Sequence, residues 1–189
     1  MAAAEETWKA NAESGDMTLV ERWNYHNELG AQLPLRRLRV IYAASGTIPA
    51  ACLLRSSPAI LEHAVYWAEV TSENEGLYLT ALINSETARA RVAAMQARGQ
   101  WGARHFDKVM FALPISRFDA SVALHNELAA AAAEAERLAQ AFELPDAVKF
   151  QRARKLVREA LIDSGVAQRI DYLVARLLDE APGNGVDED

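Results

Sequence analysis

Basic side chains gather in two stretches of this acidic chain. The 189 residues carry a formal charge of −6, yet residues 30–61 and 87–106 each contain four arginines and no acid. In the second stretch, two glycines flank Trp101, so backbone, cations and an aromatic ring can all approach a ligand closely. Arginines bind phosphates and aromatic rings stack on bases or sugars, so this composition is compatible with a nucleic-acid contact. The candidate contact residues are Arg36, Arg37, Arg39, Ser45, Thr47, Arg98, Trp101, Arg104, His105 and Lys108. Solvent-exposed arginines and a tryptophan packed on a helix would produce the same pattern.

Residue types that commonly carry catalysis lack the spacing that catalysis requires. None of the four histidines pairs with another ligand at a zinc-like spacing, which argues against a metal site. Ser45 lacks the nucleophile-elbow pattern, and the isolated glycines form no phosphate-binding loop. Cys52 lies in an apolar run, where we expect it to be buried and inert. A lone cysteine also fits a reduced, cytoplasmic protein. We therefore expect no catalytic residue, metal or cofactor in this chain.

The elements that position these side chains predict an α+β fold. Residues 37–57 form two β-rich runs joined by Ser-Gly-Thr, a hairpin signal, and residues 64–70 predict a third strand. Ser72 followed by Glu75 has capping-box spacing and predicts a helix, and Ser85 is the N-cap candidate of another helix that runs to about Ala97. Residues 108–115 predict a strand or extended segment that ends at Pro114. A short helix is expected within residues 17–29.

From Ala120 onward the pattern is helical. A long helix carries an apolar stripe at three- and four-residue steps, Leu124, Leu128, Ala131, Ala135, Leu138 and Phe142. Two amphipathic helices follow, at about 146–162 and 166–180, hinged at Ser164-Gly165. The stripe is either a coiled-coil seam for a partner or, as we expect, covered by these last helices.

These boundaries divide the chain into four segments. They are a flexible acidic N-terminus (1–19), an α/β recognition-like globule (20–118), the long helix with the C-terminal helices (119–180), and a disordered acidic tail (181–189). No window approaches the apolar length of a membrane helix, so we expect no membrane association.

Three stretches, in this order, resemble a known family. The first is LPLRRLRVIYAASGTIPAACLL, the second HAVYWAEVTSENEGLYLTALINS, and the third ARGQWGARHFDKVMFALPISRFD. Within them the "LYL…LNS" helix start is matched by residues 77–79 and 83–85. The glycine-rich turn matches 99–102, the lysine is Lys108, and the "LPIP"-like stop is matched by residues 113–115. Together, residues 30–140 resemble the C-terminal target-recognition region of bacterial DNA adenine methyltransferases of single-chain restriction–modification enzymes. Type I specificity subunits share the last features in looser form.

The resemblance implies a globule that faces duplex DNA and a long helical spacer that packs it onto its neighbours. The family's glycine-rich loop for S-adenosylmethionine and its Asn-Pro-Pro-Tyr motif are missing from this sequence. Because base flipping needs that pocket, the resemblance implies DNA recognition without methyl transfer. The catalytic methyltransferase part is then a separate subunit, or the chain is a detached remnant. The alternative is a protein-interaction module that binds through its long helix and has no role with nucleic acid.

Overall fold

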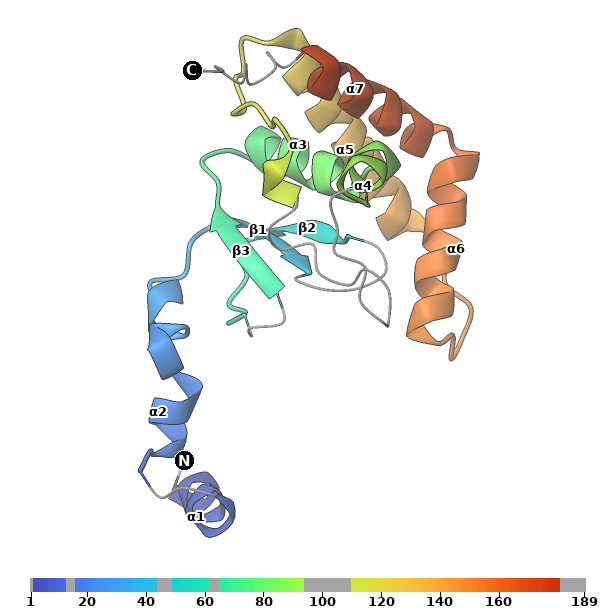
Figure 1. The fold of residues 1–189 in the computed structure, drawn as a ribbon. Coiled ribbons are helices and arrows are strands. Elements are labelled where there is room, and N and C mark those ends of the chain that lie inside the picture. The colour runs from blue at the N-terminus through green and yellow to red at the C-terminus, as the bar shows by residue number, and fades with distance from the viewer. Residues whose placement is uncertain (1, 13–15, 44–48, 62–64, 94–109, 181–189) are drawn as a thin grey trace, which may run out of the picture.

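The computed structural model describes residues 2–12, 16–43, 49–61, 65–93 and 110–180. Its centre is a three-stranded antiparallel sheet, β1 (Leu38–Ala43), β2 (Ala51–Arg55) and β3 (Val65–Glu69), in the order β2-β1-β3. Helices cover one face of this sheet (Figure 1). The α+β class and all three predicted strands are thus confirmed.

Strand register decides which side chains face the helices. Val40 lies opposite Leu53 on β2 and Ala68 on β3, and Val40, Leu53 and Tyr42 are buried in the core. Side chains alternate along a strand, so Arg39 and Ile41 point to the other face. This alternation places one arginine of the first basic stretch beneath the sheet, away from the helical layer.

Helix α3 (Glu73–Asn84) packs between the sheet and the long helix. Its N-cap is Ser72, whose Oγ accepts from the backbone N–H of Glu75 at 3.1 Å. The reciprocal half of the predicted capping box is shifted by one residue, because the Glu75 carboxylate accepts from the N–H and hydroxyl of Thr71 at 2.6 and 2.7 Å. Gly76 lets the helix approach β2: a Cβ there would lie 2.5 Å from Cδ1 of Leu53.

Helix α4 (Glu86–Ala93) begins where the sequence predicts. Ser85 Oγ accepts from the N–H of Ala88 at 3.0 Å, and Asp171 from the last helix accepts from the N–H groups of Glu86 and Thr87. The predicted end near Ala97 lies outside the described residues.

The predicted strand or extended segment at 108–115 is wrong for residues 110–112. Met110–Ala112 is a short 3-10 helix. Met110 and Leu113 are both buried while Ala112 is exposed. A three-residue turn puts positions i and i+3 on one side, so it buries both apolar side chains in the core.

Three helices complete the fold, α5 (Ala123–Ala141), α6 (Phe150–Asp163) and α7 (Val166–Glu180). Gly165 adopts φ +80°, a left-handed conformation that glycine tolerates, and turns the chain between α6 and α7 as predicted. Helix α6 begins at residue 150 rather than 146, because Val148 N–H closes a turn onto Pro145 O at 3.3 Å.

Helix α7 covers the long helix, as expected. On α5, Leu124, Leu128 and Ala131 are buried. On α7 the buried side chains are Val166, Ile170, Leu173, Val174, Leu177 and Leu178. The N-terminal half of the apolar stripe of α5 is therefore buried within the chain, and Ala135 and Leu138 are partly buried against the same core. Helix α6 lies at the edge of this bundle and buries no residue completely.

The N-terminal segment contains more structure than its composition suggests. Helix α1 (Ala2–Asn11) lies in the segment expected to be flexible, and α2 (Leu19–Trp23) matches the expected short helix. Two 3-10 turns, η1 (Tyr25–Asn27) and η2 (Gly30–Gln32), lead to the sheet. Figure 1 shows α1 and α2 standing clear of the sheet and the helical layer.

Candidate nucleic-acid interface

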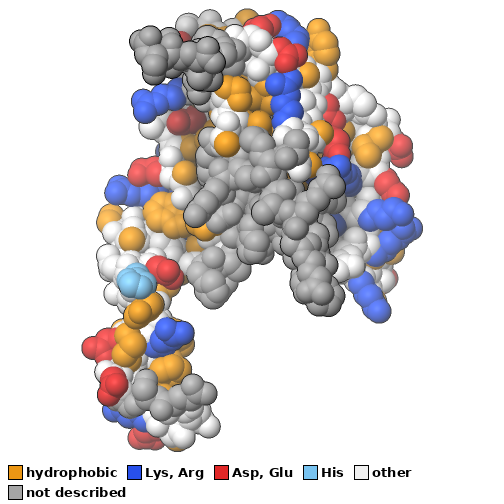
Figure 2. All heavy atoms as spheres, in the orientation of Figure 1, with side chains coloured by type: hydrophobic (Ala, Val, Ile, Leu, Met, Phe, Trp, Pro, Cys, Tyr) orange, Lys and Arg blue, Asp and Glu red, His pale blue; other side chains and the backbone are white. Residues whose placement is uncertain are grey.

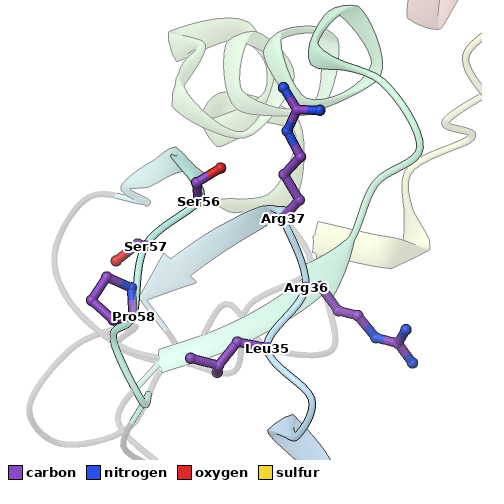
Figure 3. A pocket seen from close by; sticks show the side chains of 6 residues that line it. All are labelled: Leu35, Arg36, Arg37, Ser56, Ser57 and Pro58. Atoms are coloured by element: carbon purple, nitrogen blue, oxygen red, sulfur yellow. The ribbon is translucent and has the colours of Figure 1, made fainter.

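Two candidate arginines line a hollow beside the sheet. Residues 35–37 lead into β1 and lie across from Ser56–Pro58, which follow β2; together they enclose about 330 Å³ (Figure 3). Arg36 and Arg37 are consecutive, and Figure 3 shows their side chains pointing away from one another. Arg36 Nε lies 3.3 Å from a Glu69 carboxylate oxygen. Arg37 is exposed and forms no ion pair with any described residue, so it is free to meet an anion.

The prediction that Arg39 contacts nucleic acid is wrong for this structure. Its side chain is 1% exposed, and Nη2 donates to the carbonyls of Ser57 and Ala59, both at 2.9 Å. The alternation of β1 turns Arg39 to the helix-free face, where segment 57–61 covers it. Gln32 holds the same segment by exchanging two hydrogen bonds with the backbone of Leu61, both at 2.8 Å. Arg39 is therefore a structural clamp.

Seven further candidates lie outside the described residues, so their role stays a prediction from the sequence. They are Ser45, Thr47, Arg98, Trp101, Arg104, His105 and Lys108.

The strongest basic surface among the described residues was missed by sequence reasoning. Residues 147–158 contain no acid and five cations, a denser run than either arginine stretch. Figure 2 shows Lys and Arg side chains over α6, at the lower right of the molecule. This acid-free run is visible in the sequence, within a segment whose amphipathic pattern also predicts an apolar side for α6. The cations are Lys149, Arg152, Arg154, Lys155 and Arg158.

These cations differ in their partners. Arg158 donates to Glu86 at 2.7 Å, which joins α6 to α4, and Lys155 lies 3.5 Å from Glu159. Arg154 lies over the ring of Phe150 at 5.6 Å. Lys149 and Arg152 make no ion pair with the described residues. We call Lys149, Phe150, Arg152, Arg154 and Lys155 the α6 basic face.

An aromatic side chain stands within this face. Phe150, at the start of α6, is 74% exposed. Another side of α6, at Ala153, Leu156 and Ala160, is half-buried against the bundle. The helix thus presents cations and one exposed ring outward while its apolar side anchors it. Such a combination meets the requirements for phosphate contact and for stacking.

A polar cluster that joins buried Tyr78 and His125 to exposed Ser116 and Asp119 has the residue types of a hydrolase triad but not its proton arrangement. Ser116 Oγ lies 3.1 Å from His125 Nε2, and the backbone N–H of Asp119 donates to His125 Nδ1 at 2.9 Å. Because Nδ1 accepts, Nε2 carries the ring proton and donates to Ser116. A general base would need the opposite tautomer, with Nδ1–H donating to a carboxylate. Tyr78 completes the cluster by donating to Ser116 O at 2.9 Å, and burial raises the pKa of its hydroxyl. The cluster therefore ties α3 to α5.

Cys52 is not buried as predicted. The thiol is exposed because Leu53 occupies the core side of β2 and alternation turns Cys52 to the other face. Local desolvation, with a smaller contribution from Glu136, raises the pKa of the Cys52 thiol. The thiolate is thus disfavoured at neutral pH, which supports the expected low reactivity for a different reason.

Two absences hold for the residues that the structure describes. No group of three or more His, Cys, Asp or Glu side chains there is arranged to hold a metal ion. Over the same residues, none of the helices has the length and apolarity needed to cross a membrane.

Comparison with protein-family models, with curated proteins and with solved structures gives no match for this chain.

Proposed function

We propose that this chain is a non-catalytic, cytoplasmic module that binds duplex DNA. The observation that carries the proposal is the α6 basic face, an acid-free run of cations on an exposed helix with an aromatic ring at its start. Local charge, rather than the net charge of −6, governs attraction to a polyanion. The resemblance of residues 30–140 to target-recognition regions supports duplex DNA as the ligand and a separate catalytic methyltransferase subunit as a further partner.

The geometry of the cations favours contact with the phosphate backbone. Lys149 and Arg152 are exposed and lack carboxylate partners among the described residues, so binding a phosphate breaks no existing ion pair. Arg37, beside the hollow, has the same property. Phosphate contacts of this kind carry no sequence information, so we expect these residues to supply affinity and not specificity.

The alternative, a protein-interaction module that binds through α5, is less well supported. Leu124, Leu128 and Ala131 of the apolar stripe that such a partner would need are buried, and Ala135 and Leu138 pack partly buried against the same core. A partner would have to displace α7 and its buried apolar side chains, which would cost several kcal/mol per exposed pair of large side chains.

Fluorescence anisotropy of the full chain with a labelled duplex tests the proposal. We expect a dissociation constant of roughly 10⁻⁶ to 10⁻⁴ M near physiological salt and a much tighter one at about 50 mM. The double variant Arg152→Glu/Lys155→Glu should weaken binding to all duplex sequences and reduce the slope of log affinity against log salt by about 2.

A matched variant controls for net charge. Arg117→Glu/Arg176→Glu makes the same change in charge on exposed residues outside α6 and should keep most of the affinity. The variant Arg98→Glu/Arg104→Glu measures the contribution of the second arginine stretch. No binding by the parent chain at about 50 mM salt, within the range where such contacts are strongest, would refute the proposal.

A further inference from the structure

The N-terminal arm, residues 2–32, presents apolar side chains that its own chain does not cover. Val20 and Trp23 on α2 are 51% and 54% exposed, and Tyr25 is exposed as well. Among the described residues of the arm, only Leu19 and Gln32 are buried. An exposed cluster of large apolar side chains on a projecting segment marks a contact site.

The arm is built as a defined unit. Thr18 and Glu21 form a reciprocal capping box at the start of α2. Trp8 Nε1 donates to Met17 O at 3.0 Å, and the N–H of Leu19 donates to the Glu5 carboxylate at 3.1 Å, which joins α1 to α2. Much of the entropy cost of ordering the arm is thus met before it binds.

The charge of the arm identifies the surface that it fits. Residues 1–32 contain six acids and two basic residues, a formal charge of −4. Two such arms repel each other, so direct pairing between arms is disfavoured. The α6 basic face has the opposite charge and its own exposed ring, Phe150. The acidic arm that carries Trp23 is therefore complementary in charge and in apolar surface to the α6 basic face that carries Phe150.

The arm cannot readily reach α6 of its own chain. Figure 1 shows the arm at the lower left and α6 at the right, with the sheet between them. Gln32, at the base of the arm, is buried and makes two hydrogen bonds with the backbone of Leu61. These bonds fix the direction in which the arm leaves the body. The complementary surface that remains is on another molecule.

We propose that the arm docks on the α6 basic face of a second copy, forming a symmetric dimer with two equal contacts. An exchange of this kind closes with two-fold symmetry, since each chain supplies one arm and one α6. The contact is salt-sensitive because part of it is electrostatic. Formation of this dimer does not depend on the proposed DNA binding, although the arm and duplex DNA would compete for α6.

Analytical ultracentrifugation of the full chain measures its oligomeric state and so tests the proposal directly. We expect a dimer at low salt that dissociates as salt rises. Trp23→Ser and Arg152→Glu/Lys155→Glu should each weaken the dimer about tenfold or more, since they remove the apolar anchor and the facing charge. The matched control Arg117→Glu/Arg176→Glu should sediment as the parent does.

A charge exchange separates a direct contact from a folding defect. Glu6 and Asp16 are exposed acids that form no ion pair with the described residues. Combining Glu6→Lys/Asp16→Lys with Arg152→Glu/Lys155→Glu should restore the dimer that the second pair disrupts. A monomer at all salts, or a dimer that all of these variants leave unchanged, would overturn the inference. A parent chain that dimerises but does not bind duplex DNA would count against the proposed function alone.

Discussion

The close approach of α3 to the sheet at Gly76, against Leu53, offers a quantitative test of this fold. A Cβ at position 76 would lie 2.5 Å from Cδ1 and 3.2 Å from Cγ of Leu53, which is buried. Replacing glycine by alanine within a helix usually stabilises it by about 1 kcal/mol. Forcing a methyl group into a packed core costs about 1–3 kcal/mol. Since three side-chain carbons of Leu53 lie within 3.2 Å of this Cβ, we expect the steric cost to exceed the gain, so Gly76→Ala should lower the free energy of unfolding by about 1 kcal/mol.

A double-mutant cycle isolates this contact. Leu53→Ala alone should cost about 2–5 kcal/mol through the cavity that it leaves. In the double variant the methyl group added at position 76 has space, so the combined loss should be smaller than the sum by about 1 kcal/mol or more. Urea unfolding of the four proteins, followed by circular dichroism, gives the values. A stabilising Gly76→Ala, or energies that add within about 0.5 kcal/mol, would show that α3 does not approach β2 this closely.

Two further predictions concern charged side chains. Arg39→Met should change the free energy of unfolding by less than about 1 kcal/mol, because relief from burying a charge without a carboxylate partner offsets the two lost hydrogen bonds. Arg39→Ala should lower the free energy of unfolding clearly more than Arg39→Met. Equal losses for the two variants, measured by denaturant unfolding, would contradict this structural role of Arg39. Hydrogen bonding by Arg89, and to a lesser extent by Arg158, lowers the pKa of Glu86 below its ordinary value of 4.5. Stability from this carboxylate is present above pH 4.5 and lost as the pH falls through the lowered pKa. Glu86→Gln should therefore destabilise the protein more at about pH 6 than at about pH 3, and an equal loss at both would refute the assignment.

Much of the secondary structure could be predicted because it depends on short-range chemistry. The hairpin of β1 and β2, the Ser72 and Ser85 caps and the turn at Gly165 each follow from a few neighbouring residues. The helix α7 has the predicted bounds because its apolar residues recur with the helical period. The prediction for Met110–Ala112 was wrong because an apolar run fits a strand or a tight turn equally well, and only packing decides between them.

The candidate interface depended more on tertiary structure. The sequence shows that residues 30–61 and 147–158 are basic, but charge along a chain does not reveal which side chains face water. Strand alternation and the cover of segment 57–61 bury Arg39, while an anchored apolar side leaves the cations of α6 exposed. Packing of distant segments also places Asp171 of α7, 85 residues along the chain from Glu86, where it accepts from the backbone N–H of Glu86 at the start of α4. Local sequence determined the elements and their caps, whereas the packing of distant segments decided which charges are free to bind a ligand.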